Sequence, residues 1–220
     1  VEVVDFDDVH YEQRIRKSPA EIELLKYNWN MVSEMFENVV PQIEVGMTER
    51  QVEGMFEAEM MRLGAESYVQ SFAPMIATGS KNSYISMCRN TLRKIEKSEI
   101  LNLAAGVSYE GYNGITCSPL VLGEIPQKIK DAVICAYEAL NYASAKMKAG
   151  TPCDVVLNAY TDYLTRYGYI DYCPYGSLHS TGMLECEAPI FTVANKRVSE
   201  QHFAKHIRQE NRPCCPVMRK

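Results

Sequence analysis

The sequence predicts an α+β domain in which helices cover one face of an antiparallel sheet, built from two related halves. The first observation is a repeated glycine pair. Gly46 and Gly64 enclose one helical segment, and Gly150 and Gly168, the same distance apart, enclose another. The second observation is that a longer amphipathic helix precedes each segment and strand-like sequence follows it. Two copies are too few for a solenoid, so we expect a pseudo-twofold pair of helix–helix–strand units.

Four helices are predicted, two in each half. Ser18–Glu21 (SPAE) is a capping box with proline at the first helical position, and the apolar steps of three and four residues behind it predict a helix of about 22 residues. Thr48–Gln51 (TERQ) is a second capping box, and Gly64 suits the left-handed residue that ends its helix. In the second half, the same period predicts helices over residues 126–147 and 151–167.

Between the two pairs of helices, the sequence changes to the period of strands. Residues 67–78 are predicted to form one strand that bends at Pro74. Residues 100–105 and 107–121 are predicted to form two more strands, with Gly106, Gly111 and Gly114 supplying bends or bulges. These strands supply the sheet on which the helices pack.

The composition is that of a globular chain, because 46% of its 220 residues are apolar and 23% are charged. A net charge of −5 argues against general nucleic-acid binding, which favours a basic face. No apolar run approaches the ~20 residues that cross a bilayer, and the N-terminus has no secretory signal pattern. The eight cysteines form no C-x-x-C pair and a chain of this size needs no disulfide scaffold, so we expect reduced thiols in a cytoplasmic protein.

Candidate catalytic groups are sparse. His179 lies among small residues in Tyr175–Gly182 (YGSLHSTG), where a ligand can approach closely, although a lone histidine in such a segment is more often structural. His202 and His206 have the i, i+4 spacing of a helical metal pair, but no third ligand accompanies them. The predicted strands carry too few carboxylates for a two-metal hydrolase. Tyrosines gather there instead, which favours sheet packing or an aromatic pocket for a cationic ligand.

Six short segments carry a family resemblance through their order and spacing: Arg14–Ile22 (RIRKSPAEI), Val45–Glu49 (VGMTE), Ser71–Pro74 (SFAP), Tyr109–Tyr112 (YEGY), His179–Gly182 (HSTG) and Glu187–Pro189 (EAP). On these segments, residues 14 to about 191 resemble the catalytic domain of the creatinase, prolidase and methionine aminopeptidase family. The resemblance implies the pita-bread fold, which is itself a pseudo-twofold duplication.

The chain departs from the metallopeptidase members of that family. Those members hold two metals with two aspartates, one histidine and two glutamates. The aspartate positions are occupied here by Ala104 and Ile115, the histidine is matched by His179, and the family's second histidine is replaced by Cys186. No I-E-P-G stretch follows residue 200. One ligand of five does not hold a dinuclear centre, so we expect neither a metal nor a cofactor.

The metal-free branch typified by creatinase implies a hydrolase of a C–N bond in a small nitrogenous compound. By this resemblance His179 acts as general base and then general acid, and Glu187 or Glu185 orients a guanidinium or amine. Cys186, at the histidine position, is a further candidate catalytic group. The walls of the substrate pocket are expected at Phe72, Tyr84 and Tyr112. Two alternatives are a non-catalytic pita-bread protein that serves as a binding module or scaffold, and an Xaa-Pro dipeptidase or aminopeptidase-type metallopeptidase.

Three regions are expected along the chain. Residues 1–13 form a linker or the end of a missing N-terminal domain, residues 14–195 form the pita-bread domain, and residues 196–220 form an atypical basic tail. Family members complete the sheet with strands after residue 200, so a domain incomplete at its C-terminal end leaves an open sheet edge and predicts a homodimer. The expected partner is a small-molecule substrate, with no nucleic acid and no membrane.

Overall fold

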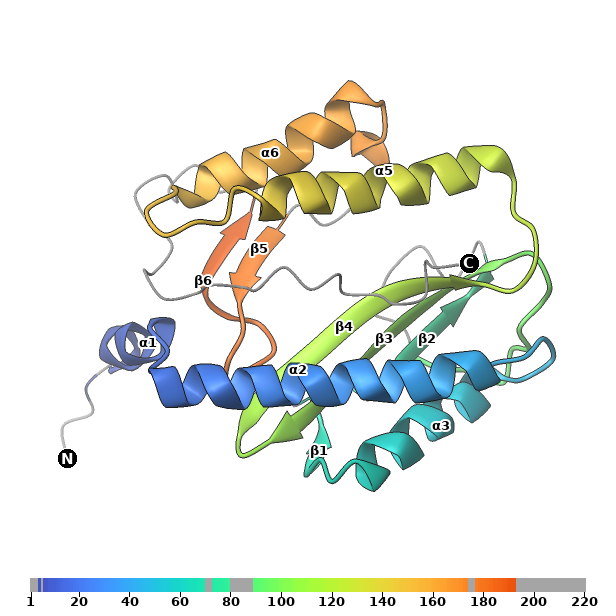
Figure 1. Cartoon of the computed structure of the whole chain (residues 1–220), viewed down its shortest axis with the longest axis horizontal. Helices are drawn as coiled ribbons and strands as arrows, with labels where there is room; N and C mark the ends of the chain where they lie inside the picture. Colours follow the sequence, from blue (N-terminus) through green and yellow to red (C-terminus); the bar gives the residue numbers. More distant parts are fainter. Residues whose placement is uncertain (1–3, 5, 70–72, 80–88, 174–176, 193–220) are drawn as a thin grey trace. The chain divides into compact units, whose positions relative to one another are not determined.

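The computed structural model describes residues 4, 6–69, 73–79, 89–173 and 177–192. Its elements in chain order are α1 (Asp7–Ile15), α2 (Pro19–Val39), α3 (Glu49–Arg62), β1 (Ser67–Tyr68), β2 (Met75–Thr78), β3 (Ile100–Tyr109), β4 (Tyr112–Val121), α5 (Gln127–Ser144), α6 (Cys153–Arg166), β5 (Ser177–Ser180) and β6 (Glu187–Thr192), with short 3-10 turns at Val40–Gln42 and Ile170–Tyr172 (Figure 1). They form two compact units. One holds α2, α3, β1–β4 and the loop 181–185, and the other holds α1, α5, α6, β5 and β6.

The helices begin where the local capping signals place them. α2 starts at Pro19, the second residue of the first capping box. Thr48 caps α3 because its hydroxyl accepts the backbone N–H of Gln51, while the Gln51 side chain accepts the backbone N–H of Thr48. The first residue of α1 is Asp7 and its last is Ile15, so this helix runs through the domain boundary expected at residue 13.

The repeat is visible in the backbone as well as in the sequence. The φ angles of its four glycines are all positive: Gly46 94°, Gly64 85°, Gly150 87° and Gly168 77°. The helices that these glycines enclose, α3 and α6, have 14 residues each. Equivalent positions in the two halves therefore need the left-handed conformation that only glycine adopts without strain.

β3 is the central strand of a four-stranded antiparallel sheet. β4 pairs along the whole of one edge, and β1 and β2 share the other edge of β3. Ser67–Tyr68 pair with Val107–Ser108, whereas Met75–Thr78 pair with Leu101–Ala104. The strand predicted over residues 67–78 is thus two short strands that follow the same edge.

The turn between the two long strands differs from the prediction. β3 continues through Gly106, and the chain reverses at Glu110 and Gly111, which have φ angles of 50° and 73°. Two consecutive positive φ angles in a two-residue loop match the twist of the paired strands. Gly106 is required for a different reason, because a Cβ there would lie 2.4 Å from both the Gly114 carbonyl oxygen and Val69 Cγ2.

Replacing Gly106 with alanine is therefore expected to destabilise the protein by about 1–3 kcal/mol, since the added methyl group overpacks the β3–β4 pair. Gly54→Ala is the matched control, because Gly54 lies exposed in α3 with no atom within 4 Å of the place that a Cβ would take, and it should gain about 0.5–1 kcal/mol. Urea denaturation followed by circular dichroism measures both. Equal stability of the two variants would show that the space around position 106 accommodates a methyl group.

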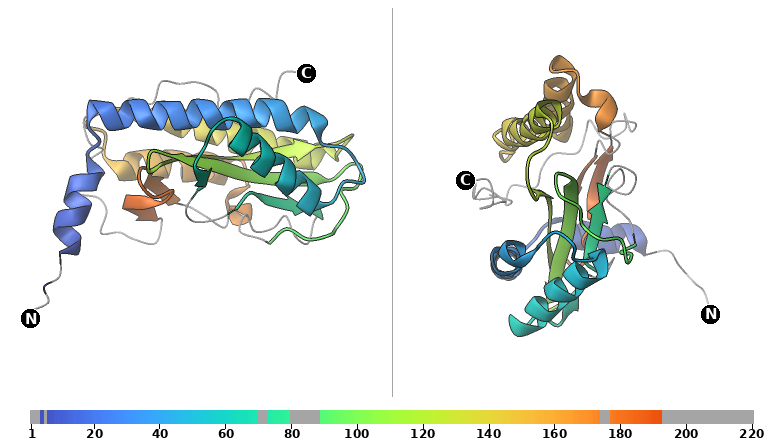
Figure 2. Two further views of the ribbon diagram at one scale, coloured as in Figure 1. Left: turned by 90° about the horizontal axis from the view of Figure 1, so that it is seen from below. Right: turned by 90° about the vertical axis from the view of Figure 1, so that its right-hand side faces the viewer.

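Helices α2 and α3 cover one face of this sheet (Figure 2). The core beneath them contains alternate β3 residues, Leu101, Leu103, Ala105 and Val107, and the ring pair Phe36–Phe56, whose centroids are 4.9 Å apart. Because side chains alternate along a strand and cross-strand partners share a face, Ala104 and its partner Cys117 lie on the opposite face. Position 115 lies on that face as well.

The other unit pairs helices with a hairpin. α5 packs against α6 through Cys135, Ala139 and Leu164, and α6 contacts β6, which pairs with β5. Among the cysteines in the described ranges, Cys135 and Cys153 are buried as small apolar residues. None of the helices in the described ranges is both long and apolar enough to cross a bilayer.

Candidate functional site

His179 lies on β5 with an exposed side chain. Nδ1 of its ring is 2.9 Å from the backbone carbonyl oxygen of Ser180. A carbonyl oxygen only accepts hydrogen bonds, so this contact is a hydrogen bond when Nδ1 carries the proton. The neutral imidazole then has its lone pair on Nε2, the atom that can take a proton from a water molecule.

A β-bulge shapes the hairpin at this histidine. His179 pairs with Ile190, whereas the next residue, Ser180, pairs with Glu187, so two residues of β6 are passed over in one step. One of the two is Pro189, which has no amide hydrogen to give to a regular ladder. A bulge redirects the side chains on either side of it, and here these include the histidine.

Glu187 is buried at the other side of the bulge. Its Oε1 atom accepts from Lys17 Nζ at 2.6 Å, and its Oε2 atom accepts from Arg14 Nη2. Lys17 Nζ also donates to Ser180 Oγ at 2.9 Å. The side chains of Lys17 and Glu187 are only 3% and 2% exposed, so the two charges neutralise each other away from water. The carboxylate expected to orient a substrate cation already has two cations of this chain as partners.

Asn113 fastens the loop 181–185 to β4. Its backbone N–H donates to the Gly182 carbonyl at 2.8 Å, and its Nδ2 donates to the Met183 carbonyl at 2.8 Å. Glu185 lies in this loop close enough to affect Cys117 on β4. Desolvation by neighbouring atoms and, next, the Glu185 charge raise the pKa of the Cys117 thiol. The loop therefore brings a carboxylate to the sheet face opposite α2.

That same face contains Ala104 and Ile115, the two positions where the resemblance implies metal-binding aspartates. Ala104 is buried and offers a methyl group, and Ile115 offers a branched alkyl group. Neither can bind a cation, since hard metals need oxygen ligands and zinc needs nitrogen, sulfur or oxygen. Over the described ranges, no three His, Cys, Asp or Glu side chains come together as a metal site would need. The side chains described here do not fit a dinuclear centre.

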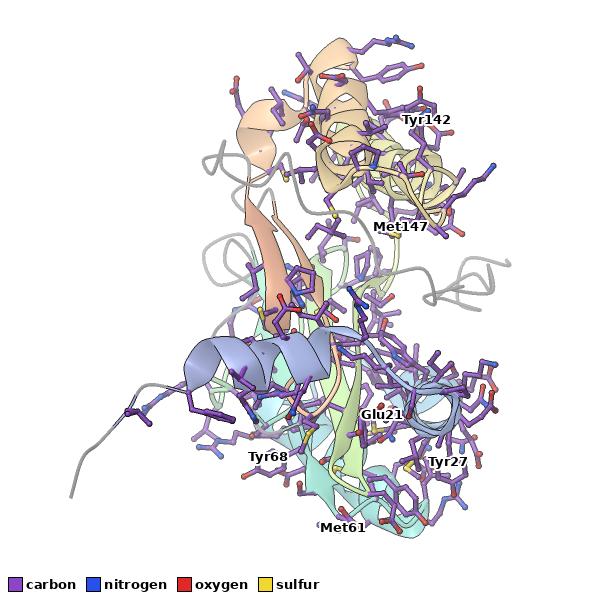
Figure 3. All side chains as sticks on the ribbon, turned by 90° about the vertical axis from the view of Figure 1, so that its left-hand side faces the viewer. Glu21, Tyr27, Met61, Tyr68, Tyr142 and Met147 are labelled. Carbon is purple, nitrogen blue, oxygen red and sulfur yellow. The ribbon has the colours of Figure 1, made fainter. Side chains whose placement is uncertain are left out.

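Tyr112 lies on the other side of the sheet. Its hydroxyl donates to Glu21 Oε1 of α2 at 2.7 Å. The next residue on its face, Gly114, is so close to α2 that a Cβ would lie 2.9 Å from the Asn28 carbonyl carbon. Figure 3 shows Glu21 and Tyr27 on this helix. The hydroxyl of Tyr112 thus helps α2 to pack on the sheet, away from the face that carries Ile115.

Of the remaining residues predicted for the site, only Cys186 lies in the described part of the chain. Cys186 is exposed and directly precedes β6. Phe72 and Tyr84 lie outside the described residues, as do His202 and His206 of the expected basic tail.

Sequence reasoning missed the polar groups that contact the β5–β6 hairpin and the loop 181–185. Lys17 and Arg14 belong to a basic cluster just before α2, and their partner Glu187 is 170 residues beyond Lys17. The only feature of the sequence that pointed to Lys17 and Arg14 was the unusual density of charge in residues 14–17, next to the start of a helix. Nothing in the sequence pointed to Asn113, because an asparagine in a strand has many structural uses.

Comparisons with known proteins agree with this architecture. The profile of metallopeptidase family M24 matches residues 23–209. An Xaa-Pro dipeptidase from Pyrococcus horikoshii is 25% identical over 183 residues, which cover 83% of this chain and 51% of the relative. The solved prolidase from Pyrococcus furiosus has a TM-score of 0.82 at 24% identity, and the match covers 90% of this chain and 57% of that one. For the X-Pro aminopeptidase from Thermotoga maritima, the TM-score is 0.77 at 23% identity, with 90% and 53% covered.

These structural likenesses confirm the predicted pita-bread fold with its antiparallel sheet. The chain spans about half the length of the curated relatives it matches.

Proposed function

Because the chain belongs to metallopeptidase family M24, we propose that it forms the catalytic part of a hydrolase that cleaves a C–N bond in a small nitrogenous compound. The observation that carries this proposal is His179, exposed on β5 with Nδ1 held at 2.9 Å from the Ser180 carbonyl. This contact leaves Nε2 as the basic nitrogen. An oriented and accessible imidazole is the group that general acid–base catalysis requires.

In the proposed reaction His179 Nε2 takes a proton from a water molecule as the water oxygen attacks the carbon of the C–N bond. The protonated imidazole then gives that proton to the leaving nitrogen as the C–N bond breaks. The products are an amine and the compound that carries the new C–O bond, so the histidine returns to its starting state. Imidazole suits both transfers because it gains and loses protons near neutral pH.

Glu185 is the carboxylate that we assign to a cationic part of the substrate. It lies in the loop that Asn113 fastens, whereas Glu187 is buried between Lys17 and Arg14. Glu187 accordingly takes a positioning role in the proposal. Cys186 stays a candidate contact to the substrate because its thiol is exposed.

The proposed reaction uses no metal held by the β3–β4 strands. The support for this part is the chemistry of Ala104 and Ile115, which offer no donor atom where the resemblance implies the aspartates of a metallopeptidase. A second candidate function is a metal-dependent Xaa-Pro dipeptidase, which the names of the relatives favour. The two candidates share the bond type and differ in the requirement for metal.

Metal content and turnover measured together test the proposal. The protein is incubated with manganese, cobalt and zinc, desalted, and analysed by plasma mass spectrometry. It is then assayed with creatine, other guanidino compounds, amides and Xaa-Pro dipeptides, with EDTA or with added manganese. We expect metal well below one equivalent and turnover that EDTA leaves unchanged. About two equivalents with manganese-dependent dipeptide cleavage would support the peptidase, and no turnover on any substrate would support a scaffold.

A further inference from the structure

Lys17 connects the two strands of the β5–β6 hairpin from outside the hairpin. Its Nζ atom lies 2.9 Å from Ser180 Oγ on β5 and 2.6 Å from Glu187 Oε1 on β6. Arg14, on α1, donates to the second oxygen of the same carboxylate. The ammonium group of Lys17 therefore connects a residue of β5 with a residue of β6, one on each side of the bulge.

Ser180 joins this ion-pair cluster to the histidine. Its hydroxyl accepts from Lys17 Nζ, and its carbonyl oxygen lies 2.9 Å from His179 Nδ1. The irregular step of the ladder falls between these same two residues, so strand pairing alone does not dictate the direction of this carbonyl. The hydrogen bond from Lys17 to the Ser180 hydroxyl restricts the orientation of Ser180 at the point where the strand pairing is irregular.

We propose that Lys17 is a positioning residue for His179, acting through Ser180. By donating to both the Ser180 hydroxyl and the Glu187 carboxylate, Lys17 keeps the Ser180 carbonyl facing Nδ1. This orientation selects the Nδ1–H tautomer and places the lone pair on Nε2, because a hydrogen bond at one ring nitrogen decides which nitrogen is protonated. The catalytic consequence rests on the proposed function, whereas the tautomer itself is a property of the fold.

The tautomer is measured directly on the full chain. Two-bond ¹H–¹⁵N correlation spectra distinguish Nδ1–H from Nε2–H imidazoles, and a His179→Asn variant identifies the signals of this ring among the four histidines. Spectra are recorded above the pH range in which histidines protonate. We expect the Nδ1–H form of His179 to predominate in the wild-type protein.

Two variants remove the constraint by different routes. Ser180→Ala deletes the hydroxyl and leaves the Lys17–Glu187 pair, so it carries the test even where Lys17→Met does not fold. Both should shift the His179 signals toward the mixed tautomers of a solvated imidazole, while Lys17→Arg, which keeps the charge, should shift them less. Lys26→Met is the matched control, because Lys26 also pairs with a glutamate, Glu23, but its side chain is 49% exposed.

The outcomes separate this inference from the proposed function. An Nε2–H tautomer in the wild-type protein, or unchanged His179 signals in folded Ser180→Ala, would overturn the positioning role whatever the enzyme does. Absence of turnover would overturn the proposed function and leave the tautomer result intact. Where both proposals hold, Ser180→Ala lowers kcat roughly tenfold with KM unchanged, and Lys26→Met changes neither kcat nor the spectra.

Discussion

His179→Ala is expected to lower kcat by about 100- to 10,000-fold, because the variant loses the group that moves the proton in both halves of the proposed reaction. The melting temperature should stay close to that of the wild-type protein. The His179 side chain is exposed, and surface truncations usually change stability by about 0.5 kcal/mol or less. Steady-state kinetics on the substrate identified by the assay panel, with thermal unfolding of the same samples, gives both quantities.

The matched control is Leu92→Ala, which truncates another exposed side chain, one that is 79% accessible. It should leave kcat and the melting temperature unchanged. A His179→Ala variant that keeps full kcat would remove the histidine from the mechanism. A variant that loses activity together with a large drop in melting temperature would make the histidine a structural residue.

Glu187→Gln is expected to lower the free energy of unfolding by about 3–5 kcal/mol, because removing one partner of a buried ion pair leaves the other charge uncompensated. Lys17 Nζ would face a neutral amide at a site where its side chain is 3% exposed, and Arg14 would lose the negative charge with which it pairs. Urea unfolding of the variant and the wild-type protein measures the difference. The exposed pair Lys26–Glu23 supplies the control, and Glu23→Gln should cost no more than about 1 kcal/mol.

A double variant distinguishes the effect of charge on stability from the effect of packing at this site. Lys17→Met with Glu187→Leu removes both charges of the buried pair and keeps apolar volume. Only Arg14, whose side chain is 16% exposed, then lacks the carboxylate, so the double variant should recover part of the stability that Glu187→Gln loses. A double variant as unstable as the single one would show that Ser180 and Arg14 depend on these groups for more than charge balance. A Glu187→Gln variant as stable as Glu23→Gln would mean that water reaches the pair.

Several helices of this protein were predictable from local sequence alone. The capping box at Thr48 and the glycines at positions 46 and 64 act within a few residues of each other, so they place α3 without any knowledge of the rest of the chain. The same signals at Gly150 and Gly168 revealed the repeat. His179 became a candidate because its short motif is contiguous.

The hairpin turn shows why strand boundaries were harder to predict. Gly106 and Gly111 look alike in the sequence, and either can end a strand. Gly111 has a positive φ angle and makes the turn, whereas Gly106 lies inside β3 where the neighbouring strand and Val69 leave no room for a Cβ. Only the packed sheet distinguishes a glycine needed for its φ angle from one needed for its small size.

Contiguous residues and motifs with fixed spacing were enough to predict the duplicated helices and the fold class, and they made His179 a candidate. Which groups lie around that histidine depends on the folded chain. Lys17 and Glu187 are 170 residues apart, and nothing in the sequence near either residue specifies the other. A buried ion pair forms only where folding has already brought two charges together and removed their water. For this reason the environment of His179 could be established only from the folded chain.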